Sequence, residues 1–97
     1  IQPQYPRRAQ ERGTMGFAIV AFTITESGTI EDVVPVEGYC TSKNPNDPEA
    51  QLRPCSIFNS ASCRAALKLK YKPKIVDGKA VKVEGVQHKF TFIMEDS

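Results

Sequence analysis

The residues able to do chemistry in this chain are three cysteines, at positions 40, 55 and 63, and one histidine, His88. A structural zinc site needs four such ligands in closely spaced pairs, whereas these residues stand singly. Nucleophilic catalysis needs a base beside the nucleophile and an oxyanion hole. No G-x-S-x-G motif or glycine-rich phosphate loop announces such a site. The sequence therefore predicts no metal site, no cofactor and no enzyme, and it favours a structural role for His88.

The cysteines are better explained as structural residues. In a small domain, three of them indicate an oxidising compartment, with one disulfide and one remaining thiol. We favour the pair Cys40–Cys55, because the segment between them is polar and proline-rich and needs a tether. The two pairings that involve Cys63 stay open. Closing a loop of about 15 residues contributes roughly 3 kcal/mol in the chain-entropy model.

Length and composition indicate one compact domain over residues 1–97, 40% hydrophobic and 25% charged. No apolar run approaches the roughly 20 residues needed to cross a bilayer. The chain opens without a methionine or a signal peptide, so we interpret it as a fragment or a mature form. The net charge of only +2 gives nucleic-acid binding little support.

Basic residues concentrate between positions 64 and 82, where no aromatic platform for bases is interleaved. We interpret this stretch as a solvated helix end, or else as a patch that steers an acidic partner or faces a membrane. Its cations are Arg64, Lys68, Lys70, Lys72, Lys74, Lys79 and Lys82.

Alternating β-branched and aromatic residues predict a strand over 17–25. Both of its faces are apolar, so it should be central or covered on both sides. A turn at Glu26–Gly28 leads to a return strand over 29–37, where Pro35 indicates an edge or a bulge. Residues 38–57 are expected to form an inserted, cysteine-bearing loop.

A helix should follow, capped by Asn59 or Ser60 and stopped by Pro73. Cys63 and Leu67 should lie on its opposite side, under the inserted loop. Lysines at 68, 70 and 72 would occupy its last turn, where the helix dipole favours cations. Helical spacing gives it one apolar face: Phe58, Ala61, Ala65, Ala66 and Leu69.

Two strands complete the pattern. Asp77-Gly78 predicts a short hairpin over 74–81, and a long last strand should run from about Lys79 to Met94. Its apolar residues change parity at Gly85, which predicts a β-bulge there. We expect this long strand at an edge, where it offers unpaired backbone groups.

The expected fold class is α+β, with an antiparallel three-stranded sheet packed on one main helix. A short N-terminal helix or turn comes first, so the order is αββαβ, with an extra hairpin strand at 74–81 as an option. Before it stands QPQYP, in which Pro3 and Pro6 fix two φ angles and stiffen a polar, aromatic leader. Composition alone would make this leader a linker end.

Taken in order, these pieces resemble the C-terminal domain of the TonB family, the periplasmic energy transducers of Gram-negative bacteria. The resemblance lies in the Q-P-x-Y-P-x-x-A entry from Gln2 to Ala9, the strand after Gly16, the segment FNSASCRAALKLKYKP, and the ending HKFTFIM. There are departures, since Leu69 stands where relatives often carry tryptophan and the 39–56 segment is unusually long. The 74–81 hairpin is found only in some relatives.

The resemblance implies an adaptor whose last strand pairs with the TonB box of outer-membrane receptors, with the leader contacting the same peptide. Arg8 falls where relatives place an arginine that pairs with an acidic residue of the receptor plug. Absent N-terminal parts would anchor the protein to the inner membrane and engage a proton-driven motor of ExbB/ExbD type. The partner-binding residues so implied are Gln2, Pro3, Gln4, Tyr5, Pro6 and Arg8, with Val86, Gln87, His88, Lys89, Phe90, Thr91 and Phe92.

Two other interpretations stay open. One is a periplasmic adaptor of the same fold that serves a secretion or envelope complex. The other is a small secreted binding or inhibitor module, in which the Cys40–Cys55 loop makes the contacts. A homodimer is a further alternative, because isolated domains with free edges can exchange strands.

Overall fold

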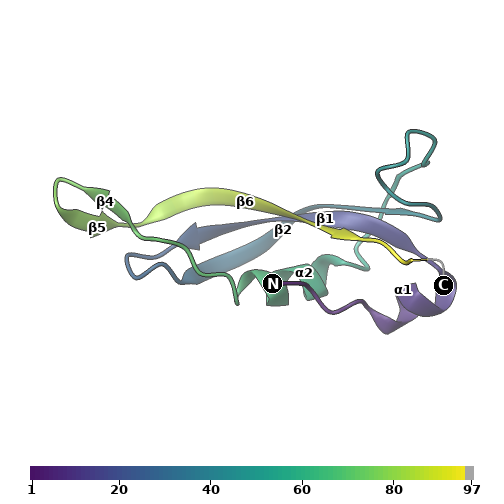
Figure 1. The fold of residues 1–97 in the computed structure, drawn as a ribbon, viewed down its shortest axis with the longest axis horizontal. Helices are drawn as coiled ribbons and strands as arrows, with labels where there is room; N and C mark the ends of the chain where they lie inside the picture. The colour runs from purple at the N-terminus through teal and green to yellow at the C-terminus, as the bar shows by residue number, and fades with distance from the viewer. Residues whose placement is uncertain (96–97) are drawn as a thin grey trace.

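A computed structural model describes residues 1–95 and shows an elongated α+β fold measuring 49 × 23 × 21 Å. Both helices lie on the same side of an antiparallel sheet, and a small hairpin projects at the opposite end from α1 (Figure 1). The sheet order is β3-β2-β1-β6, and β4 pairs only with β5. The elements are α1 (Arg7–Arg12), β1 (Met15–Ile24), β2 (Ile30–Thr41), β3 (Arg53–Pro54), α2 (Asn59–Ala66), β4 (Lys74–Val76), β5 (Lys79–Val81) and β6 (Val83–Phe92).

The predicted fold class is confirmed, with one addition: the two-residue strand β3 extends the three long strands. β1 is central, as expected, between β2 and β6. Alternation along it buries Ala18, Val20 and Phe22 in the core. The opposite face, with Phe17 and Ile19, is only half-buried. The second apolar face of β1 is therefore only partly covered, and the rest of it is accessible to solvent.

β2 carries the irregularities that Pro35 predicts. Its pairing with β1 shifts register twice, once beside Pro35 and once near Asp32, which adopts a left-handed φ of 55°. It also runs to Thr41 rather than ending at 37, because Gly38 and Tyr39 continue to pair with β1. The predicted loop over 38–57 was therefore too long at its start.

A disulfide joins Cys40 at the end of β2 to Cys55, the pairing favoured from the sequence. Cys40 is buried, and the Cys55 amide donates to the carbonyl of Gly38 at 3.0 Å. Between these points the loop holds only the short strand β3. Cys63 is a half-buried free thiol, and burial raises its pKa above 9.0.

Helix α2 is shorter than predicted. It ends at Ala66, well before Pro73, and the chain then leaves the helix so that the Tyr71 amide can donate to the Gly28 carbonyl at 3.0 Å. A Cβ on Gly28 would stand 2.1 Å from the Tyr71 carbonyl oxygen, so this approach requires glycine. The predicted placement of Lys68, Lys70 and Lys72 in the last helical turn was wrong.

The expected caps and the expected back of α2 also need correction. Phe58 occupies the N-cap position, and neither Asn59 nor Ser60 caps the helix. Leu67 is 56% exposed and lines a hollow beside the leader instead of packing under the loop. The predicted apolar face is otherwise confirmed. Its members Phe58, Ala61, Ala65 and Ala66 are buried, and Leu69 is partly buried against the core.

The predicted hairpin and bulge are both present. Asp77 and Gly78 form the turn between β4 and β5 with positive φ angles of 50° and 78°. In β6, Val86 pairs with Phe22 and Val83 pairs with Ile24, so two residues of β6 oppose one of β1. Gly85 lies within this bulge at a φ of 68°, a conformation that favours glycine.

The predicted last strand from Lys79 to Met94 was too long at both ends, because Lys79–Val81 forms β5 of the hairpin and β6 runs only from Val83 to Phe92. The break falls at Lys82, before the bulge.

An aromatic cluster closes the core. Phe58 stacks on Phe92 with ring centroids 4.3 Å apart, and Tyr5 meets both rings edge-on at 5.8 and 5.6 Å. Phe58 is fully buried. The cluster therefore joins the leader, the start of α2 and the end of β6.

We expect Phe58→Ala to lower the free energy of unfolding by about 3–5 kcal/mol, because it empties the centre of this cluster. Urea unfolding would measure the loss. The matched control is Ile75→Ala, since Ile75 is 60% exposed on the hairpin and should change stability by less than about 0.5 kcal/mol. Equal effects of the two substitutions would contradict this account of the core.

Replacing Cys40 and Cys55 together by alanine should cost about 3 kcal/mol of unfolding free energy, because the closed loop no longer restricts the unfolded chain. Reducing the unaltered protein with dithiothreitol should have a similar effect. Cys63→Ala leaves the disulfide in place and serves as the control. A double variant as stable as the oxidised protein would contradict the structural role of this bond.

Candidate functional site

The strongest candidate for a binding site is the free edge of β6. Within the described residues β6 pairs only with β1, so its other side presents unpaired backbone donors and acceptors. Its register with β1 is uninterrupted from Val86 through Phe92, against Phe22 through Gly16. This regular stretch coincides with the residues that the sequence predicts as a partner-binding strand.

Side chains along this stretch alternate in exposure. Gln87, Lys89 and Thr91 are exposed, whereas Phe90 and Phe92 are buried. The Lys89 ammonium lies 4.2 Å from the centroid of the Phe17 ring on the open face of the sheet. The buried Phe90 and Phe92 side chains anchor the strand in the core. What the free edge offers a partner is therefore mainly its backbone N–H and C=O groups.

The opposite edge of the sheet is much less suited to pairing. β3 covers β2 only at Tyr39 and Cys40, so the rest of that edge is open. However, Pro35 lacks an N–H group and two register shifts interrupt the strand. Prolines and bulges are the usual devices that protect an edge from added strands. Of the two edges, only that of β6 therefore offers a long, regular row of backbone groups for an added strand.

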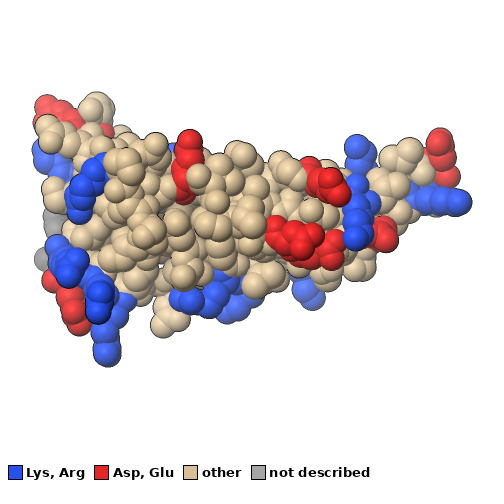
Figure 2. Space-filling view, turned by 180° about the vertical axis from the view of Figure 1, so that it is seen from behind, with Lys and Arg blue, Asp and Glu red and all other residues tan. Residues whose placement is uncertain are grey.

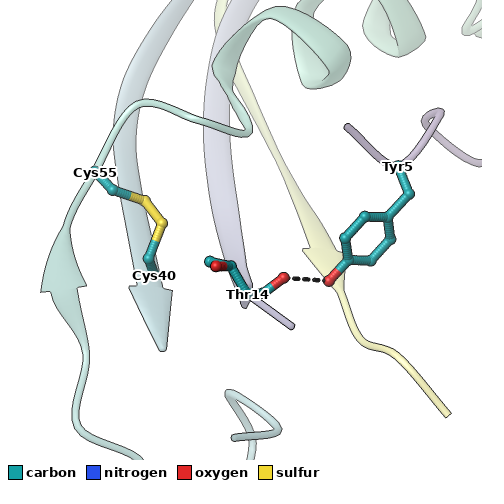
Figure 3. Close-up of a disulfide and its surroundings, with 4 residues drawn as sticks. All are labelled: Tyr5, Thr14, Cys40 and Cys55. Atoms are coloured by element: carbon teal, nitrogen blue, oxygen red, sulfur yellow. Dashed lines mark hydrogen bonds between the residues drawn. A yellow bond between two sulfur atoms is a disulfide. The ribbon is translucent and has the colours of Figure 1, made fainter. Parts of the chain in front are cut away.

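The leader is anchored beside this edge by Tyr5 rather than by its prolines alone. The Tyr5 hydroxyl donates a hydrogen bond to the backbone oxygen of Thr14 (Figure 3). Its ring lies against Phe58 and Phe92. Burial raises the pKa of this phenol above its ordinary value of 10.0. Pro6 then precedes α1 at its N-cap position.

The leader and the end of β6 share a hollow of about 240 Å³. Gln2, Pro3 and Tyr5 line one side, while Thr91, Phe92 and Ile93 line the other. The structure thus brings together two segments that the sequence predicts as one site. Ile93 was missed, although its place directly after the strand was a usable signal.

Three other predicted site residues lie outside this hollow. Gln4 faces a second hollow beside α2. Arg8 is exposed on α1 and takes part in none of the ion pairs found among residues 1–95, which are Lys43–Glu49 and Lys82–Glu31. The half-buried His88 lies on Phe90, with ring centroids 4.4 Å apart.

Charge is unevenly spread over the molecule. Viewed from behind, a broad area left of the centre is uncharged, while basic side chains lie along the lower edge of the middle and acidic ones gather to its right (Figure 2). Residues 1–95 hold no group of three or more histidine, cysteine or acidic side chains placed to bind a metal ion. Within the same residues, no helix is long and apolar enough to cross a membrane.

Comparisons with known proteins agree with this geometry. Residues 1–39 match the family model described as Gram-negative bacterial TonB protein C-terminal. Protein TonB of Pseudomonas aeruginosa strain PAO1 is 33% identical over 79 residues, or 81% of this chain. The chain spans only 19% of the length of that protein.

Solved structures extend the likeness to the whole fold. The solution NMR structure of the Pseudomonas aeruginosa TonB C-terminal domain superposes with a TM-score of 0.68 at 30% identity, covering 100% of this chain and 83% of the other. The TonB2 protein of Vibrio anguillarum superposes with a TM-score of 0.60 at 32% identity, covering 98% and 76%. The similarity therefore includes β6, which the family model does not reach.

Tyr5→Phe should lower the free energy of unfolding at neutral pH by about 1 kcal/mol, the net value of one hydrogen bond. Because burial raises the phenol pKa, the folded state holds this proton more tightly than the unfolded chain. The contribution of Tyr5 is thus complete below pH 10.0 and is lost as the pH rises through the folded-state pKa. Urea unfolding from about pH 7 to pH 11 should show the wild-type advantage shrinking. An advantage that stays constant would contradict this role of the phenol.

Proposed function

Because this chain belongs to the family of TonB C-terminal domains, we propose that it binds the TonB box of outer-membrane receptors. It acts as the periplasmic part of a TonB-type energy transducer, and the receptor segment adds as a strand along β6. One observation carries the proposal: β6 has a free edge with uninterrupted register from Val86 to Phe92. The leader lies at the end of this edge, where it can contact the same peptide.

Strand addition explains how one domain could serve many receptors. Backbone pairing depends little on the side chains of the peptide. Alternate residues of the seven-residue stretch each present an N–H and a C=O group, which gives about six to eight ladder bonds. At about 1 kcal/mol net each, they leave a modest affinity after the cost of association.

The same geometry suits the transmission of force. A peptide pulled along its own axis loads its ladder bonds in shear, so several bonds resist together. Resistance to pulling can then exceed what the equilibrium affinity suggests. The proton-driven motor of the inner membrane would supply this pull through parts of the protein outside this chain.

The leader should improve binding by being held in place beforehand. The Tyr5 contacts fix it against Phe58 and Phe92, so little conformational entropy is lost when a peptide docks. Gln2 is exposed at the hollow beside Thr91 and can hydrogen-bond the peptide. Arg8, exposed on α1, is the candidate for pairing with an acidic residue of the receptor plug.

Proline substitution along β6 tests strand addition directly. Neighbouring residues of a strand direct their N–H groups alternately to the two sides, so Val86→Pro and Lys89→Pro remove donors on opposite sides. One variant should weaken pairing with β1 and lower the melting temperature. The other should weaken binding of a labelled TonB-box peptide by about tenfold with the fold retained. Fluorescence anisotropy and thermal melting measure the two effects.

Two controls make the result specific. Lys89→Ala keeps the backbone N–H and should leave peptide binding within about twofold. Val36→Pro places a second proline beside Pro35 at the opposite edge and should not affect binding. If both β6 proline variants fold and neither weakens binding, the peptide does not add to this edge.

A further inference from the structure

A second hollow, of about 360 Å³, lies on the other side of the leader from β6. Leader residues 2–4 form one wall, and the other wall comes from α2 and from Leu67 and Lys68 just after it. Gln2 and Pro3 line both hollows. The leader is therefore a ridge between two depressions, and the binding strand accounts for only one of them.

The floor of this hollow is apolar. Ala61 and Ala65 are four residues apart on α2, and their small side chains leave room between the helix and the leader. Leu67 adds an apolar wall with 56% of its surface exposed. Such an exposed large side chain beside a depression marks a surface suited to an apolar group of a partner.

The rim is cationic. Arg64 and Lys68 line the hollow, are exposed, and belong to neither of the ion pairs found among residues 1–95. Arg64 lies in the last turn of α2 and Lys68 lies two residues beyond its end, so two like charges stand on the rim of one hollow and repel one another. A carboxylate bound between them would relieve that repulsion. The hollow thus complements an acidic side chain next to an apolar one.

We propose that this hollow binds an acidic, leucine-like segment of the same receptor chain that pairs with β6. The inference rests on the proposed function, because the shared residues Gln2 and Pro3 make the two hollows one continuous surface. A peptide that leaves the β6 edge beside Thr91 has only the leader to cross before it reaches the cations. The second hollow would then distinguish receptors, which the backbone ladder cannot do.

The test uses fluorescein-labelled peptides and the whole chain. One peptide carries a TonB-box sequence alone, and others carry it with Asp-Leu-Glu-Leu added at either end. Matched peptides carry Asn-Leu-Gln-Leu instead. We expect one acidic extension to tighten binding about fivefold to tenfold at low salt, and the gain to fall as salt rises. The amide extension should give no gain.

The variant Arg64→Gln with Lys68→Gln should abolish the gain and leave binding of the unextended peptide within about twofold. The control, Lys70→Gln with Lys72→Gln, removes the same charge from residues outside the hollow and should keep the gain. Matching circular dichroism and melting temperatures would show that both variants fold. A gain lost equally in both variants, or no gain with the acidic extension, overturns the proposal.

Failure of the proposed function gives a different pattern, in which the unextended peptide does not bind at all. In that case acetyl-Asp-Leu-Glu-Leu-amide is titrated into ¹⁵N-labelled protein. Shifts confined to residues that line this hollow, with Gln4, Arg64 and Lys68 among them, would support the acidic site by itself, and their absence would overturn it. Vesicles of phosphatidylglycerol that bind through Arg64 and Lys68 while the peptides do not would also overturn it.

Discussion

The contact among Tyr5, Phe58 and Phe92 is the interaction on which the rest of the structure depends. These three rings come from the leader, the start of α2 and the end of β6, and together they fasten segments far apart in sequence. The hydrogen bond from the Tyr5 hydroxyl to the Thr14 backbone oxygen also ties the leader to the residue that precedes β1. Without this cluster the leader would have no fixed position beside the free edge of β6, and both hollows would lose a wall.

An open edge is a hazard for a small β protein, because another chain can pair with it. This fold protects one edge and leaves the other available. Pro35 and two register shifts interrupt β2, whereas β6 stays regular after its bulge at Gly85. The exposed Lys89 side chain on β6 disfavours pairing between the β6 edges of two molecules, and it does so without removing a backbone donor. The contrast between the edges is what the proposed addition of a receptor peptide along β6 requires.

Much of the fold could be predicted because its signals are local. The parity change at Gly85, the Asp77-Gly78 turn and the two-sided apolar strand each fall within a few residues, and each appears in the structure. The pairing of Cys40 with Cys55 followed from the composition of the segment between them. The end of α2 could not be predicted this way, because the bond from Tyr71 to Gly28 competes with continued helix.

The sequence by itself determined the three long strands in outline, the position of the bulge in the last one, and that a stiff leader precedes a domain resembling those of TonB. Only the tertiary structure decided that the Tyr5 ring is packed inward on Phe58 and Phe92 while Gln2 is left exposed, and that Gln2 and Pro3 separate two hollows. The physical reason is the separation in sequence over which each interaction acts. Periodicity and turn chemistry act between neighbours in the chain, whereas the position of the leader depends on rings more than fifty residues away from it.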